Sequence, residues 1–116
     1  MTTMTVVKRE NIENNVLTPA GLREGADHGN PQLGIQSLAP EANGNLGIWE
    51  CQPGGWPVID RKDTEFCYII SGKATLTDER TGEKRDVTEG DLIILPVGWT
   101  GRWDVTETVR KIYTIY

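Results

Sequence analysis

A chain of 116 residues with a net charge of −5 is long enough for one domain with an apolar core that needs no disulfide or structural metal. The negative charge argues against a nucleic-acid partner, because phosphate groups attract basic surfaces. The sequence contains no run of about twenty apolar residues and no basic, then apolar, leader, so we expect no membrane span, no signal peptide and a cytoplasmic location.

The first 45 residues are rich in Asn, Gly and Pro and contain only short apolar pieces, which predicts an irregular arm with one or two edge strands. No helical periodicity of useful length is present. From residue 46 onward, short apolar runs alternate with Gly and Pro signals. These runs predict seven strands, at residues 46–51, 65–70, 73–77, 84–87, 92–95, 102–105 and 109–115.

Short strands at this spacing must close or stack to hide their apolar faces and edges. We therefore predict a single all-β domain, built as a sandwich, jelly roll or small barrel. Residues 1–45 form its N-terminal arm, and residues 46–116 form the barrel.

Alternation along the strand at residues 65–70 separates two faces. Glu65, Cys67 and Ile69 share one face, and the opposite face, which includes Tyr68, is also mainly apolar. We expect one face to line the interior and the other to be covered by the arm or by a second protomer, and a homodimer is the preferred cover. The last strand alternates in the same way.

The two cysteines, Cys51 and Cys67, lie in apolar, strand-like sequence and form no CxxC pair. In a reducing compartment this context predicts buried free thiols. Cys67 shares a strand face with Glu65, which permits a second interpretation as a nucleophile. No histidine lies nearby in the sequence to activate it, so we expect a packing role.

Two stretches resemble the motifs of the cupin superfamily. Glu65, six residues and Gly72 are similar to the second half of the first motif, G(X)5HXH(X)3-4E(X)6G. The stretch GDLIILPVG at 90–98 is similar to the opening of the second motif, G(X)5PXG(X)2H(X)3N. Further short stretches resemble the type 3 cupin group, which includes ureidoglycine aminohydrolases and ethanolamine-utilisation cupins. The resemblance covers about residues 46–116 and implies a double-stranded β-helix, the RmlC-like jelly-roll barrel.

The resemblance points to a metal site, but most of the ligand positions carry other residues. In place of three histidines stand Val58 and Asp60, or Ile59 and Arg61 under the alternative spacing, and Gly101. A divalent transition metal needs several imidazole, carboxylate or thiolate donors, which Glu65 alone does not supply. His28, Asp60 and Cys67 are the remaining possible donors. We predict no metal and no other cofactor.

A carboxylate in a barrel interior has to be paired, protonated or hydrated, because burying it alone costs several kcal/mol. Lys111 is the predicted partner of Glu65, since it lies within an apolar strand. We expect the two side chains to meet where a cupin would hold its metal and to be the charged, catalytic groups of the site. In the alternative, Lys111 extends outward and backbone amides or a tyrosine hold Glu65.

Four tryptophans are many for a chain of this length, and they predict aromatic walls for a small-molecule pocket. Trp56 and Trp99 lie in Gly- and Pro-rich sequence and are expected at the barrel mouth, whereas Trp49 and Trp103 lie on strands, where packing is the alternative role. The predicted ligand-binding residues are Tyr68, Trp56, Trp99, Trp103 and Tyr113.

These features predict a cupin that binds a small polar molecule in its barrel without metal. Two alternatives stay open. In one, the chain is a metabolic hydrolase similar to ureidoglycine aminohydrolase, or an isomerase or lyase, with Glu65 or Lys111 as general acid or base. In the other, the chain is a non-catalytic scaffold or sensor whose ion pair only fills the former metal position.

Overall fold

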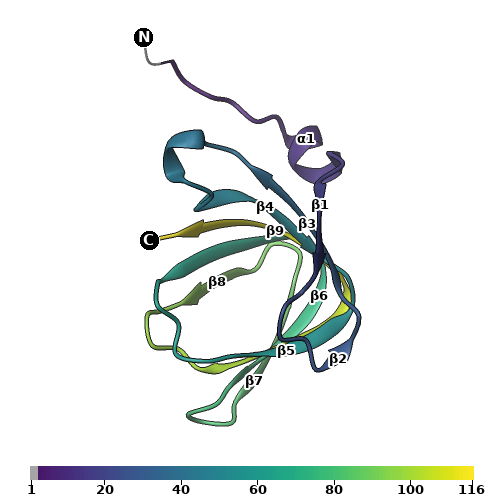
Figure 1. The fold of residues 1–116 in the computed structure, drawn as a ribbon, viewed down its shortest axis with the longest axis vertical. Helices are drawn as coiled ribbons and strands as arrows, with labels where there is room; N and C mark the ends of the chain where they lie inside the picture. Colours follow the sequence, from purple (N-terminus) through teal and green to yellow (C-terminus); the bar gives the residue numbers. More distant parts are fainter. Residues whose placement is uncertain (1–2) are drawn as a thin grey trace.

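The computed structural model describes residues 3–116, so the first two residues of the predicted arm lie outside the described chain. The described residues form nine β-strands, one short α-helix and one 3₁₀ turn (Figure 1). In chain order the elements are α1 (Arg9–Asn14), β1 (Thr18–Leu22), β2 (His28–Gly29), β3 (Gln32–Ser37), the 3₁₀ turn (Pro40–Ala42), β4 (Leu46–Cys51), β5 (Gly54–Val58), β6 (Glu65–Asp78), β7 (Lys84–Thr88), β8 (Leu92–Leu95) and β9 (Gly101–Ile115).

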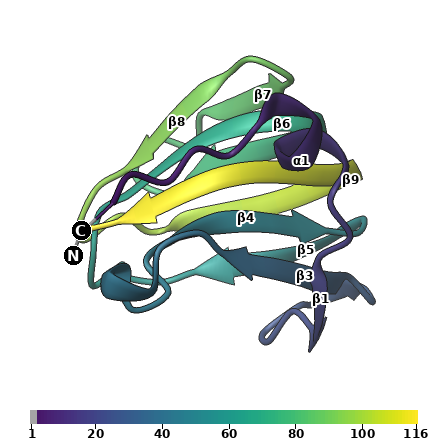
Figure 2. The same cartoon turned by 90° about the horizontal axis from the view of Figure 1, so that it is seen from above.

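The two long strands β6 and β9 form the frame of the molecule, because each takes part in two layers (Figures 1 and 2). They pair antiparallel from Glu65 opposite Ile115 to Asp78 opposite Gly101. The first half of β6 also pairs with β8 and its second half with β7. The second half of β9 pairs with β4 and its first half with β5. The two layers, β1-β3-β4-β9-β6-β8 and β2-β5-β9-β6-β7, enclose one interior, which confirms the predicted all-β jelly roll.

Strand β6 bends at Gly72, where it passes from one layer to the other. Its register with β9 is irregular between Ile69 and Ala74, and Gly72 has a φ of +93°. A β-carbon at this position would lie 2.0 Å from the backbone oxygen of Thr108 on β9. Glycine is required here for its backbone conformation and for the close approach of the two strands.

The structure joins or adds elements that sequence patterns do not show. The predicted strands at 65–70 and 73–77 are halves of β6, and those at 102–105 and 109–115 are halves of β9. Strand β5 has the sequence GGWPV, in which Gly and Pro indicate a loop, yet it pairs with β9 along all five residues. Strand β3 of the arm pairs with β4 and so extends the same sheet.

Arg110 of β9 holds the short helix α1 against the barrel. Its buried guanidinium donates to the backbone oxygens of Ile12 at 2.8 Å and Asn15 at 2.5 Å, and it pairs with Glu50 at 3.1 Å. These bonds satisfy carbonyl groups at the C-terminal end of the helix. A helix of six residues is too short to show a hydrophobic period and depends on such contacts. No helix in the described chain is long and apolar enough to cross a membrane.

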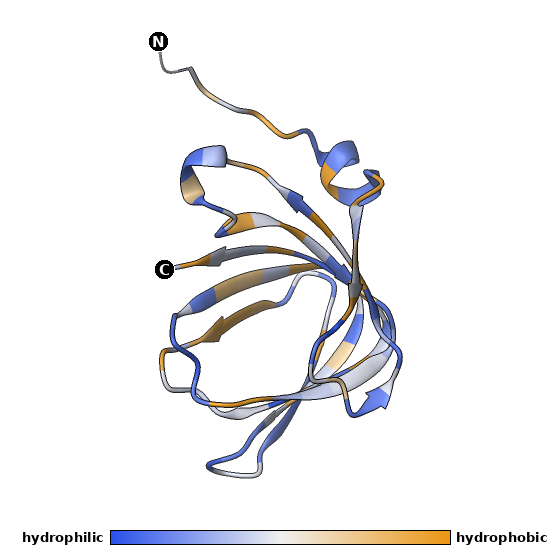
Figure 3. Cartoon of the chain, viewed as in Figure 1, coloured by the Kyte–Doolittle hydropathy of each residue, from blue (hydrophilic) through white to orange (hydrophobic). Residues whose placement is uncertain are grey.

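Alternate residues of β6 and β9 face the barrel interior. Glu65, Cys67 and Ile69 are buried, whereas Tyr68 is 42% exposed, so the predicted alternation of β6 is confirmed. Strand β8 consists mainly of hydrophobic residues, whereas the hairpin between β6 and β7 is hydrophilic (Figure 3). The interior is filled by apolar side chains from both layers, among them Cys51, Trp56, Ala74, Leu76, Ile93, Leu95, Trp103, Val105 and Val109.

We predict that Gly72→Ala lowers the free energy of unfolding by roughly 3 kcal/mol or more, because it combines a positive φ with a backbone clash. Gly82→Ala is the matched control, since Gly82 also has a positive φ (+73°) but its β-carbon would meet nothing within 4 Å. The control should cost about 1 kcal/mol. Urea unfolding measures both values, and equal losses would contradict the role of Gly72 in the bend.

Candidate functional site

A cavity of about 270 Å³ opens into the barrel beside the start of β6. Its walls come from β3, β4, β5, β6 and β9, together with the loops after β1, before β4 and before β6. The charged lining residues are Arg23, Arg61, Glu65 and Lys111, and the aromatic ones are Trp49, Trp56, Trp103 and Tyr113.

An ion pair between Glu65 and Lys111 lies at the wall of this cavity. Nζ of Lys111 donates to Oε2 of Glu65 at 2.8 Å. Both residues are buried: Lys111 is 5% exposed and Glu65 is 7% exposed. Lys111 stands opposite Ile69 in the β6–β9 register, so its long side chain runs back along the interior to reach Glu65. The predicted contact is therefore present, and Lys111 does not extend outward.

Arg61, in the loop before β6, contacts the second oxygen of Glu65. Its Nη1 lies 3.3 Å from Oε1, and its Nε donates to the backbone oxygen of Asp63 at 3.1 Å. Each carboxylate oxygen of Glu65 thus faces a cation. These contacts offset the desolvation that a lone buried carboxylate would suffer.

Three tryptophans form a wall in the cavity, and two of them contact the ammonium group of Lys111. Its Nζ lies 4.2 Å from the ring centroid of Trp49 and 4.6 Å from that of Trp103, which is cation–π geometry. Trp56 stacks on Trp103 with 6.1 Å between centroids and 10° between planes. Trp49 meets Trp56 edge to face, also at 6.1 Å. The rings hold one another rigidly because offset and edge-to-face contacts are favourable.

Arg23, in the loop after β1, lies over the outer part of this wall. Its guanidinium carbon is 5.0 Å from the ring centroid of Trp56, and its Nη1 donates to the backbone oxygen of Glu24. Arg23 is half-buried, and this burial lowers the pKa of its guanidinium. Within the described chain it forms no ion pair with a carboxylate.

Tyr113 completes the wall next to the ion pair. Its hydroxyl donates to the backbone oxygen of Gly44 at 2.8 Å, and burial raises the pKa of Tyr113 above its ordinary value. The hydroxyl is therefore protonated at neutral pH and engaged with the backbone. Tyr113 and the tryptophans Trp56 and Trp103 all line the cavity, as the sequence predicts, while their contact with a ligand stays a prediction.

The donor set of this cavity does not fit a transition metal. Glu65 already faces two cationic groups, and residues 3–116 contain no group of three His, Cys, Asp or Glu side chains able to hold an ion. At the third histidine position, a β-carbon on Gly101 would lie 2.2 Å from the backbone oxygen of Thr77, so a side chain has no room there. The alternative donors His28 and Asp60 are exposed.

Two residues predicted to bind the ligand lie away from this cavity. Tyr68 lies on the outer face of β6, because alternation turns it away from the face that carries Glu65. Trp99 lines a different cavity, and its ring covers Gly101. Trp56 lies on β5 and is buried, rather than in a loop at the rim. The assignment of Tyr68 and Trp99 to this site is therefore corrected.

Three of the charged and aromatic lining residues were not predicted. Under the alternative spacing of the first cupin motif, Arg61 falls on a histidine position, and this match was the available signal. Trp49 lies on β4 two residues before the buried Cys51, so the two side chains share the inward face of the strand. Arg23 has no signal in the sequence, because only the folding of the arm brings its loop to the barrel.

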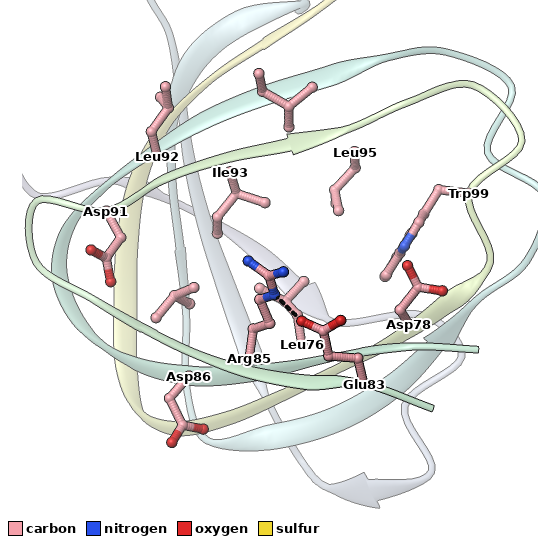
Figure 4. Close-up of a pocket in the computed structure, with 12 residues that line it drawn as sticks. Leu76, Asp78, Glu83, Arg85, Asp86, Asp91, Leu92, Ile93, Leu95 and Trp99 are labelled. Carbon is pink, nitrogen blue, oxygen red and sulfur yellow. Dashed lines mark hydrogen bonds and ion pairs between the residues drawn. The ribbon is translucent and has the colours of Figure 1, made fainter. Parts of the chain in front are cut away.

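A second and larger cavity, of about 460 Å³, lies on another side of the barrel, between β7 and β8. Figure 4 shows Ile93, Leu95 and Trp99 lining it and acidic side chains such as Asp78 and Asp86 around it. Its charged groups are all at least partly exposed. The smaller cavity is the better candidate site because its charged groups converge and two of them, Glu65 and Lys111, are buried.

A jelly-roll barrel with convergent side chains in its interior is the architecture of cupins. The model of the EutQ-like cupin domain matches residues 38–113, about two thirds of the chain. The chain therefore belongs to the family of EutQ-like cupin domains, and the predicted resemblance to type 3 cupins is confirmed. Among curated proteins, none matches the chain.

Three solved structures share the fold. A protein of unknown function from Pseudomonas syringae pv. tomato is 26% identical over 87% of this chain, with a TM-score of 0.74. A DUF861 family protein from Thermotoga maritima is 32% identical over 72%, with a TM-score of 0.57. The EutQ protein of Clostridium difficile is 21% identical over 74%, with a TM-score of 0.62. The chain spans 44%, 99% and 63% of these proteins, respectively.

The buried thiols generate a prediction on pH. Burial raises the pKa of Cys51 and that of Cys67 to about 11, from an ordinary value of 9.0. Between these values the unfolded chain loses thiol protons that the folded chain keeps, so the free energy of unfolding should fall as the pH rises from about 9 to 11. Urea unfolding across this range tests the slope. The double variant Cys51→Ala/Cys67→Ala should show a shallower slope, and an identical slope would contradict the assignment.

Proposed function

We propose that the chain binds a small polar metabolite in the cavity beside Glu65, without a metal, and that Glu65 and Lys111 are its charged anchors. The observation that carries this proposal is a buried ion pair at the wall of an open cavity. Such a pair adds little net stability compared with apolar side chains of similar volume, so folding alone does not account for it. Convergent charges within aromatic walls are what small-molecule recognition requires.

The size of the cavity supports a binding role over a scaffold role. An interior that served only as a scaffold would be closed by its own side chains, whereas about 270 Å³ stays open here. Ligand pockets usually span roughly 300–1,000 Å³, so this volume suits a small metabolite. Trp49, Trp56 and Trp103 supply rigid surface for its apolar part.

A metabolic enzyme is the second candidate, and the 2.8 Å contact between Glu65 and Lys111 favours it. A carboxylate and an ammonium group in contact are an acceptor and a donor that could move a proton to or from a bound substrate. The matching reaction classes are a hydrolase step similar to that of ureidoglycine aminohydrolase, an isomerisation or an elimination.

We also propose that the protein is cytoplasmic, because the buried free thiols Cys51 and Cys67 suit a reducing compartment.

A thermal-shift screen of small polar metabolites, followed by calorimetric titration of each hit, tests the proposal. We predict that Glu65→Gln and Lys111→Met each weaken the affinity for a hit by about tenfold or more, because a buried charged contact is lost. Mass spectrometry of each hit after incubation with the protein separates the two candidate functions. Chemical conversion of the hit by the wild type, lost in Glu65→Gln, supports an enzyme. Binding without conversion supports a binding protein.

The matched controls are Lys73→Met and Glu107→Gln, which remove the partners of an exposed ion pair at 3.5 Å. These variants should keep the wild-type affinity. Thermal unfolding of every variant identifies any loss that reflects misfolding. Hits that bind the Glu65 and Lys111 variants as tightly as the wild type would show that the ligand lies elsewhere.

We also propose a homodimer, supported by exposed apolar side chains on the outer face of β6 and β8. Tyr68, Leu92 and Ile94 are 42%, 53% and 58% exposed, and Tyr68 stands opposite Leu92 in the register. Such a patch suits burial against a second copy. Sedimentation velocity should give a dimer that Leu92→Glu/Ile94→Glu dissociates. A monomeric wild type at micromolar concentration would refute this interface.

A further inference from the structure

The cavity has a positive charge excess inside a negatively charged protein. Its described lining carries three cationic side chains, Arg23, Arg61 and Lys111, and one anionic side chain, Glu65, so the excess is two charges. The chain as a whole has a net charge of −5. In a partly dehydrated cavity, charges interact more strongly than in water. The local excess therefore attracts an anion against the overall charge of the molecule.

The guanidinium groups of the two arginines have hydrogen-bond donors that are not used for carboxylate groups within the described chain. Arg61 contacts Glu65 at 3.3 Å without forming a hydrogen bond to it in the described chain, and Arg23 contacts the face of Trp56 instead of a carboxylate. A guanidinium presents donors in a planar fork that matches carboxylate and phosphate oxygens. Both arginines belong to loops at the cavity, where a ligand can reach them.

The groups that would receive a cation are already occupied. Glu65 is engaged by Lys111 on one oxygen and by Arg61 on the other. The faces of Trp49 and Trp103, which could otherwise surround a ligand ammonium group, surround Nζ of Lys111. A cationic ligand would therefore meet three like charges and no free carboxylate among the described lining residues.

We propose that the metabolite is a small organic oxyanion, a carboxylate or a phosphate ester, whose charged group is bound by Arg23 and Arg61 and whose body contacts the tryptophan wall. This inference rests on the proposed function and gives its ligand a chemical class. In this arrangement Glu65 and Lys111 stay the anchors for the polar part of the body of the metabolite. Lys111 also neutralises Glu65 and so leaves the arginine charges available to the anionic group.

Four probes test this class. They share a phenyl ring and carry an anionic, neutral or cationic group: benzoate, phenyl phosphate, benzamide and benzylammonium. Binding is measured by tryptophan fluorescence in a Trp99→Phe background, which removes the tryptophan that lies outside the site. We expect benzoate or phenyl phosphate to bind at least about tenfold more tightly than benzamide, and benzylammonium not to bind. Added NaCl should weaken anion binding. The stronger of the two anions identifies the source of the oxyanion.

The variants Arg23→Gln and Arg61→Gln should each weaken binding of the stronger anion by about tenfold or more. Arg80→Gln is the control, since it makes the same change in net charge at an exposed position in the β6–β7 hairpin. It should bind the anion like the wild type. Thermal unfolding shows whether each variant is folded. If an arginine variant is unfolded, the salt dependence and the relative affinities of the four probes for the Trp99→Phe protein still test the inference.

Different outcomes overturn the two levels of the proposal. The oxyanion class would be overturned if benzamide or benzylammonium bound as tightly as both anions. It would also be overturned if the anion affinity were unchanged in both arginine variants. Either result would still leave a site for a polar ligand. Absence of binding by all four probes at millimolar concentration would also overturn the oxyanion class. If the metabolite screen then gave no hit at this cavity, the proposed function would fall as well.

Discussion

The carboxylate of Glu65, buried where β6 begins, constrains the whole site. Its charge must be compensated inside the barrel, and the compensation comes from Lys111 on the distant strand β9 and from Arg61, four residues earlier in the loop before β6. Lys111 reaches it only because β6 and β9 pair antiparallel along their length. A change in that register by one residue would turn Lys111 outward and leave the carboxylate with a single cation.

The same constraint arranges the aromatic wall. With Nζ of Lys111 held against Glu65, the faces of Trp49 and Trp103 enclose a cation that belongs to the protein. The first cupin motif places a metal beside this glutamate, and here an ammonium group lies beside it. The side chains of the cavity thus offer charge, hydrogen bonds and a proton donor–acceptor pair on rigid strands, where their positions are well determined.

Alternation and turn signals were enough to predict most of the barrel strands, because inward and outward positions on a strand differ in hydrophobicity. The same rule put Glu65 and Tyr68 on opposite faces of their strand and so, applied strictly, already excluded Tyr68 from the site. The position of Lys111 was predicted from the need to compensate the charge of Glu65. Local signals failed where tertiary contacts decide the structure. Gly72 marked a break in the sequence but allows a continuous bent strand, and the Gly and Pro residues of β5 pair with β9 despite their low strand propensity.

The loops explain why the charge of the site could not be predicted. The strand residues alone give a balanced pair, Glu65 with Lys111, which suggests a neutral polar ligand. Arg23 and Arg61 come from loops, whose residues follow no period, and the position of Arg23 depends on the backbone bond from its amide to Pro31. These two arginines change the balance from neutral to positive. In the proposed binding mode, the strands therefore determine the position of the ligand, and the loops determine which ligand charge the cavity favours.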